Sequence, residues 1–257
     1  MDSDSTPPES SSTTTTNRDS RPFSRPFSRL LSRKVQFYVV LTVAFAIPIL
    51  SSLAVLLGHR TLHTAPPHAF IRVVLYQVCG LLCLYLALRY QKRSLKDIGV
   101  RLPMRITEVA HSFALFFGAF PLAIVVGLVL VGVYAMFGHQ AYRPFNESAL
   151  FGSHITIWTV LFVLLNPFHE ELIVRGFLIT EMEHFYNNTA LAVFVSVLIQ
   201  SSYHLYQGLA AALLHASTFL LFSIYFVRTR RILPVVMAHM FLDVSALAIY
   251  ARHLPKT

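Results

Sequence analysis

Charged residues are scarce in this sequence. Asp, Glu, Lys and Arg together make up 13% of the 257 residues, and hydrophobic residues make up 55%. A typical soluble domain has about 25% charged and roughly 45 to 50% apolar residues. The scarcity of charge therefore argues against a water-soluble fold.

Cysteine is nearly absent, and so is the alternation of apolar and polar residues that marks the strands of a membrane β-barrel. The two cysteines, Cys79 and Cys83, lie four residues apart within an apolar stretch. Helical spacing places both on one face. We interpret them as packing residues, which carry no information about the redox compartment.

Long apolar stretches dominate the sequence instead. Blocks of about 20 residues can cross a hydrocarbon core of roughly 30 Å as helices, and backbone groups in lipid have to be hydrogen-bonded within the chain. The sequence therefore predicts an all-α, polytopic transmembrane bundle of about seven spans with short connections. The predicted spans cover residues 35–57, 69–88, 109–137, 155–182, 190–206, 209–227 and 232–250.

Basic residues lie mainly beside the apolar blocks. Membrane topology therefore explains the net charge of +9, and we predict no nucleic-acid partner. Residues 1–34 are rich in Ser, Thr, Pro and Arg, which predicts a disordered basic tail. The run from Val35 to Leu57 is longer than a signal-peptide core, and no cleavage-type motif follows it.

The distribution of these basic residues predicts the orientation of the chain. They cluster before the first span, between the second and third spans, and at positions 228–231 after the sixth span. The segments around 58–68 and 138–154 hold one arginine each. Because basic loops stay in the cytoplasm, we predict an inside N-terminus and an outside C-terminus.

Ionisable residues inside apolar spans are costly and are functional candidates by default. The fourth predicted span contains the sequence from Pro167 to Phe177, with two adjacent glutamates and an arginine. On a helix, Glu171 and Arg175 are neighbours at i and i+4, whereas Glu170 points roughly 100° away. Arg175 can therefore neutralise Glu171 and leave Glu170 facing elsewhere.

Two later spans contribute histidines. His204 lies at the end of the fifth span, and His239 and Asp243 lie in the seventh, where i, i+4 spacing places them on one face. Together with a glutamate, these groups could polarise a water molecule and stabilise an oxyanion. We interpret His111 and His215 as groups that form hydrogen bonds between helices.

The order of these motifs resembles the CPBP (Abi) family, which contains the CAAX prenyl endopeptidases and bacteriocin-processing proteins. The shared pattern is Glu-Glu-x-x-x-Arg, then a histidine, then His-x-x-x-Asp or Asn, each in its own late span. The stretch from Leu95 to Pro103 also resembles the usual lead-in to the conserved region of the family. The resemblance covers residues 95–250. This sequence has Gln200 where the family usually has Phe, four residues before His204.

The resemblance implies an intramembrane glutamic endopeptidase without a cofactor. Carried over by position, Glu170 and His204 would activate the water, and Glu171 and Arg175 would support the site.

The resemblance also assigns His239 and Asp243 to the oxyanion side. Many family members carry asparagine at the second position, and an asparagine amide can donate a hydrogen bond, whereas an ionised aspartate only accepts. We therefore expect Asp243 to accept a hydrogen bond from one nitrogen of His239. The other nitrogen would then donate to the oxyanion.

Other functions stay open. A zinc metalloprotease could use His204, His239 and a glutamate as ligands, although the sequence contains no H-E-x-x-H pattern. A non-catalytic membrane scaffold or immunity protein is the second alternative, because family resemblance does not guarantee activity. A transporter with a proton relay is favoured least.

The chain divides into a disordered tail (1–34), two transmembrane helices (35–94), a CPBP-like catalytic transmembrane domain (95–250) and a short C-terminal tail (251–257). We expect a multi-pass protein of a bacterial cytoplasmic membrane. Its partners would be membrane lipids and a peptide or protein substrate, with or without a lipid modification. The glycosylation sequons at Asn146 and Asn187 are too common to indicate another membrane.

Overall fold

The computed structural model describes residues 32–136 and 148–254, and these residues form helices without any strand. The all-α prediction is confirmed. The predicted tail up to residue 31 and the sequon at Asn146 lie outside the described residues. The elements are α1 (Arg33–Leu56), α2 (Pro67–Tyr90), η2 (Leu95–Ile98), α3 (Ile106–Met136), α4 (Ser148–Phe151), α5 (Ile157–Glu171), η3 (Leu172–Ile179), α6 (Thr180–Tyr186), α7 (Thr189–Ser202), η4 (Leu205–Gln207), α8 (Leu209–Thr229) and α9 (Leu233–His253).

Six segments in the described part of the chain are long and apolar enough to cross a membrane. One of them, Ile157–Tyr186, joins α5, η3 and α6 into a single span. The predicted fifth span is shorter than expected, because α7 has only 14 residues. At 1.5 Å per residue it measures about 21 Å, less than the hydrocarbon core of roughly 30 Å.

The chain turns back after α7 through η4 and Gly208. Gly208 has φ 97° and ψ 156°, a backbone conformation that is essentially restricted to glycine. This turn is anchored to α1, since the backbone N–H of Tyr206 donates to Oγ of the buried Ser52 over 2.7 Å. The end of the fifth predicted span is therefore held against α1, with its residues partly buried.

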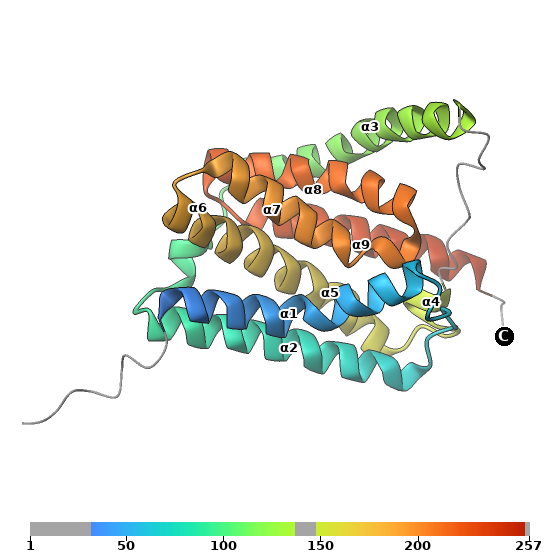
Figure 1. The fold of residues 1–257 in the computed structure, drawn as a ribbon, viewed down its shortest axis with the longest axis horizontal. Helices are drawn as coiled ribbons and strands as arrows, with labels where there is room; N and C mark the ends of the chain where they lie inside the picture. Colours follow the sequence, from blue (N-terminus) through green and yellow to red (C-terminus); the bar gives the residue numbers. More distant parts are fainter. Residues whose placement is uncertain (1–31, 137–147, 255–257) are drawn as a thin grey trace, which may run out of the picture.

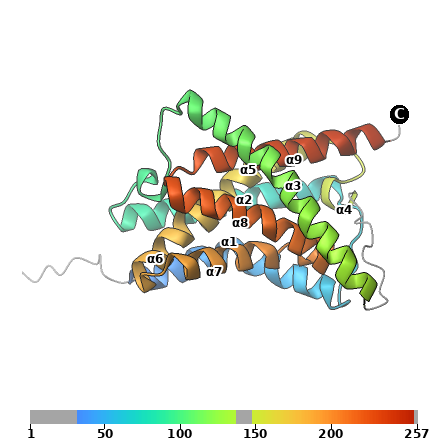
Figure 2. The ribbon, with the colours of Figure 1, turned by 90° about the horizontal axis from the view of Figure 1, so that it is seen from above.

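The span formed by α5, η3 and α6 lies in the middle of the bundle (Figure 1). It packs against α2 and α9 through α5, and against α1, α7 and α8 through η3. Helices α1 and α2 run side by side along one flank, and α3 crosses over α8 and α9 (Figures 1 and 2). The residues of the central span are thus shielded by neighbours on several sides.

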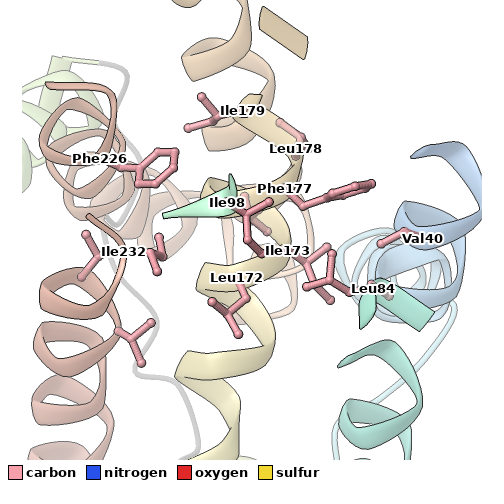
Figure 3. Packing of buried hydrophobic residues seen from close by; sticks show 14 of the residues in the cluster. Val40, Leu84, Ile98, Leu172, Ile173, Phe177, Leu178, Ile179, Phe226 and Ile232 are labelled. Carbon is pink, nitrogen blue, oxygen red and sulfur yellow. The ribbon is translucent and has the colours of Figure 1, made fainter. Parts of the chain in front are cut away.

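The loop between α2 and α3 contributes directly to the core. Ile98 is fully buried and lies among side chains of η3, with Phe226 and Ile232 to one side (Figure 3). The approach is close, because a Cβ atom on Gly176 would lie 2.8 Å from the carbonyl oxygen of Ile98. The carbonyl of Gly99 accepts a hydrogen bond of 3.0 Å from the N–H of Ile232. The lead-in motif therefore fastens the loop to the central span and to the start of α9.

Ion pairs gather the predicted cytoplasmic segments at one end of the bundle. The pairs connect the start of α1, the end of α2, the start of α3, α6 and the turn between α8 and α9. They are Arg33 with Glu181, Arg93 with Glu181, Arg230 with Glu183, and Arg231 with Glu108. At the other end, the N–H of Ala65 donates to the carbonyl of Ser148. Segments that were predicted to lie on the same side of the membrane therefore contact one another at the same end of the bundle.

The compartment of each end stays a prediction, which cysteine labelling tests. In a Cys79→Ser, Cys83→Ser background, Ser153→Cys should react with a membrane-impermeant maleimide applied to intact cells, because its side chain is exposed at the predicted outer end. Thr229→Cys should react only after the membrane is permeabilised. The opposite labelling pattern would invert the orientation.

Candidate active site

Glu171 lies at the centre of a buried polar cluster. Its Oε1 accepts a hydrogen bond from Nη1 of Arg175 over 3.0 Å and lies 2.7 Å from Nδ1 of His239. Both Glu171 and Arg175 are fully buried. The predicted contact between Glu171 and Arg175 is confirmed, and His239 is an additional partner that helical spacing could not reveal. Glu171 therefore links the fourth and seventh predicted spans.

Arg175 also contacts α8. Its Nη2 donates to the carbonyl of Phe219 over 3.3 Å, and its guanidinium lies 5.1 Å from the centre of the Phe219 ring. The charge of Arg175 is therefore shared between a carboxylate, a backbone carbonyl and an aromatic face.

Glu170 has different surroundings, as its position on the helix predicts. Its Oε2 accepts a hydrogen bond of 2.8 Å from Nε2 of Gln200, and within the described residues it takes part in no ion pair. The hydroxyl of Tyr203, a buried residue, lies near Glu170 as well. The two adjacent glutamates thus differ in kind: one is bound to an arginine, and the other is bound to a neutral amide.

Gln200 was not predicted to be a site residue. The signal in the sequence was its polarity within an apolar helix and its departure from the usual Phe of the family. In the structure the Gln200 side chain has a partner in the site, because its amide donates a hydrogen bond to one oxygen of Glu170.

The expected arrangement of His239 and Asp243 is only partly found. Nε2 of His239 lies 3.5 Å from Oδ1 of Asp243, which is longer than an ordinary hydrogen bond. The other nitrogen is not free to donate to an oxyanion, because Nδ1 faces Glu171. The reason is tertiary: the packing of α5 against α9 places Glu171 on the buried side of the imidazole ring. Glu171, not Asp243, is thus the carboxylate that orients the ring.

Two residues missed by the sequence interpretation hold Asp243 instead. Nδ2 of Asn166 donates to Oδ2 of Asp243 over 3.1 Å, and Nε2 of Gln77 donates to Oδ1 of Asn166 over 2.9 Å. This chain of amides crosses from α2 through α5 to α9. The available signal was again polarity within apolar stretches, together with the i, i+4 spacing of Asn166 and Glu170.

His204 lies beside the cluster, at the start of η4. Its ring centre is 5.3 Å from that of Phe219 and 4.9 Å from that of His215. Neither ring nitrogen has a hydrogen-bond partner among the described residues. The structure shows no direct contact between His204 and Glu170, but the ring lies within electrostatic range of Arg175 and His239. Phe219, which touches both His204 and Arg175, connects this histidine to the cluster.

The central span changes its helical form at the site. A π-helix, η3, begins directly after Glu171, and its eight residues, which include Arg175, are all buried. Such turns are rare and occur frequently at functional sites. The predicted fourth span is confirmed as one continuous helical segment, and its local change to a π-helix is a detail that the sequence did not predict. The contact between Glu171 and Arg175 survives it.

No set of three His, Cys, Asp or Glu side chains in the described ranges is arranged to hold a metal ion. The described groups offer the chemistry of carboxylates, imidazoles and amides. Glu170 could accept a proton, and His204 and His239 could donate or accept one.

The comparison with protein families agrees with the predicted resemblance. Residues 152–245 match the model of the Rce1-like family, described as type II CAAX prenyl endopeptidase Rce1-like. This range includes all six predicted site residues, whereas the lead-in motif from Leu95 to Pro103 lies outside it. The comparisons with curated proteins and with solved structures gave no match.

Proposed function

Taking the match of residues 152–245 to the Rce1-like CAAX endopeptidases as the premise, we propose that this integral, multi-pass membrane protein is an endopeptidase in which Glu170 activates water. The observation that carries the proposal is the contrast between the two adjacent glutamates. Glu171 is bound to Arg175 and His239, whereas Glu170 is buried at 6% exposure and bound to the neutral amide of Gln200. A carboxylate without a bound cation is the better proton acceptor of the two.

Glu170 and His204 act on the water. Gln200 holds Oε2 of Glu170, which directs the proton-accepting role to Oε1. The two unpartnered ring nitrogens of His204 are suited to bind a water molecule or the substrate, because buried polar atoms in proteins normally have a partner. The water would lose a proton to Glu170 as it attacks the carbonyl carbon of the scissile peptide bond. Glu170 would then return this proton to the leaving amine as the C–N bond breaks.

His239 stabilises the oxyanion that forms. Glu171 accepts from Nδ1 and orients the ring, so that Nε2 of the protonated imidazole can donate to the developing negative charge. Asp243 lies 3.5 Å from that nitrogen and is held back by Asn166. The substrate oxygen would thus compete with Asp243 for the hydrogen bond from Nε2. Asp243 is the weaker competitor because it is already bound to Asn166.

Substitutions at Asp243 test this arrangement. Asp243→Asn should keep appreciable activity, since an amide can accept from Asn166 through its oxygen and donate to the oxyanion through its nitrogen. Asp243→Leu should lose most activity, and His239→Ala should be at least as damaging because it removes the donor itself, by about 100-fold or more in kcat. Rates would be measured with purified variants in proteoliposomes. A His239→Ala protein with the rate of the wild type would reduce α9 to a packing element.

The assay for the function itself uses a defined probe. Because the name of the matching family includes prenyl endopeptidases, we propose a lipid-modified peptide as the first substrate to test. A peptide with a farnesylated cysteine followed by two aliphatic residues and a C-terminal residue would be compared with the same peptide without the farnesyl group. Release of the last three residues, detected by mass spectrometry, is the expected result.

The same assay tests the proposed absence of a metal. Cleavage should continue after dialysis against a chelator, because the proposed mechanism needs only side chains and water. Loss of cleavage, with recovery on addition of zinc, would favour the metalloprotease alternative. If neither peptide is cleaved, another substrate would be sought by comparing the peptidomes of cells with and without the protein. If those peptidomes are identical as well, the non-catalytic scaffold is the better interpretation.

A further inference from the structure

A pocket of about 330 Å³ lies away from the candidate active site, between the last turns of α2 and the loop that follows. Its walls come from two stretches close together in the sequence, residues 85–93 and 94–102. The lining residues are Tyr85, Leu88, Arg89, Arg93, Ser94, Leu95, Lys96, Val100 and Leu102. The proposed reaction uses none of them.

The pocket carries positive charge that no described acidic group neutralises. Arg93 donates to Glu181 and to Gln91, so its charge is already compensated. Arg89 and Lys96, in contrast, are exposed and form no ion pair with another described residue. Two cations therefore face one pocket without a partner, which favours an anionic ligand.

The rest of the pocket is apolar and open to the surface of the bundle. Leu88 is buried and closes the pocket on the inside, whereas Tyr85, Leu95 and Leu102 are 48%, 40% and 75% exposed. Since Tyr85 belongs to the last turns of a helix that is long and apolar enough to cross a membrane, we expect this exposed apolar wall to face the lipid headgroups and upper acyl chains. A ligand here would contact cations at one end and apolar side chains at the other.

We propose that this pocket binds an anionic phospholipid, with its phosphate between Arg89 and Lys96 and the upper part of an acyl chain against Tyr85 and Leu102. Basic pockets at the cytoplasmic face of membrane proteins are suited to such headgroups, and the positions of the basic loops predict that this pocket lies on that face. A soluble anion would leave the apolar wall uncovered.

Bound lipid would also stabilise the span formed by α5, η3 and α6, which carries the candidate active site. The loop that lines the pocket places Ile98 against Gly176 in η3, directly beyond Arg175. A lipid that holds this loop in place should therefore raise the thermal stability of the whole protein, because ligand binding to the native state stabilises it.

The test uses the purified full-length protein. Native mass spectrometry would measure the ratio of bound phosphatidylglycerol to bound phosphatidylcholine. The Arg89→Gln, Lys96→Gln variant should lower this ratio by about 25-fold, because each basic residue near a membrane surface contributes about fivefold to the attraction of an anionic lipid and the two factors multiply. The matched control, Lys92→Gln, Arg101→Gln, removes the same charge from the same loop outside the pocket and should keep the ratio of the wild type.

Two further measurements separate the possible occupants. Phosphatidylglycerol should raise the melting temperature of the wild type and of the control, but not that of the Arg89→Gln, Lys96→Gln variant. Leu102→Ala should weaken lipid binding without any change in charge, because it removes part of the apolar wall. If the pocket bound only inorganic phosphate, this substitution would have no effect on binding. The proposal is overturned if the two double variants lower the ratio of bound phosphatidylglycerol to phosphatidylcholine equally, or if neither lowers it. It is also overturned if inorganic phosphate raises the melting temperature as much as the lipid does.

Discussion

Replacing Glu170 with glutamine is expected to abolish cleavage while the protein still inserts and folds. Glutamine has nearly the same shape and can keep a hydrogen bond to Gln200 (2.8 Å in the structure), but it cannot take a proton from water. Loss of a general base typically costs 10² to 10⁴ in rate, so kcat should fall to about that extent. The measurement is turnover of the peptide probe, or peptidomics of cells that express the variant.

A matched control is available in the same span. Glu183 pairs with Arg230 at the end of the bundle, away from the site, so Glu183→Gln should cleave at nearly the rate of the wild type. Gel filtration and thermal melting of both variants would show that the folds are equal. If Glu170→Gln cleaves as fast as Glu183→Gln, another group activates the water.

Glu171→Gln is expected to act mainly through stability. Arg175 is fully buried, and Glu171 is its only carboxylate partner among the described residues. Breaking a buried pair by removing one partner typically costs about 3 to 5 kcal/mol, because the remaining charge is left uncompensated. The free energy of unfolding, measured by denaturant titration in mixed micelles, should fall by about that amount. Orientation of His239 should be weakened as well, since the neutral amide oxygen is a weaker acceptor for Nδ1 than a carboxylate.

A second substitution separates these two effects. Replacing the whole pair, as in Glu171→Leu, Arg175→Met, should restore much of the stability, because apolar replacements of buried ion pairs are often neutral or stabilising. Activity should stay low, since His239 still lacks its orienting carboxylate. A double variant that recovers both stability and activity would show that Glu171 has no part in the reaction.

Much of this molecule could be predicted from its sequence because two strong local rules apply. Lipid requires apolar helices of a certain length, so six of the seven predicted spans correspond to long helices. Ionisable residues are so unfavourable in those spans that their positions alone identified Glu170, Glu171, Arg175, His204 and His239 as candidates. Helical periodicity, which relates residues four apart, predicted the contact between Glu171 and Arg175.

Contacts between helices could not be predicted in this way, because periodicity says nothing about which faces of different helices meet. Only tertiary packing placed His239 against Glu171, and so changed the role expected of Asp243. The same packing brought Gln200 to Glu170 and Asn166 to Asp243.

The form of two elements was likewise decided by packing. The central span widens into a π-helix where its residues are entirely enclosed, and α7 stops at Ser202 because the turn that follows docks on Ser52 of α1. The sequence by itself determined a helical membrane protein and the side chains able to carry its chemistry. The tertiary structure decided which of those side chains touch, because only the folded chain brings residues far apart in sequence to within hydrogen-bond distance.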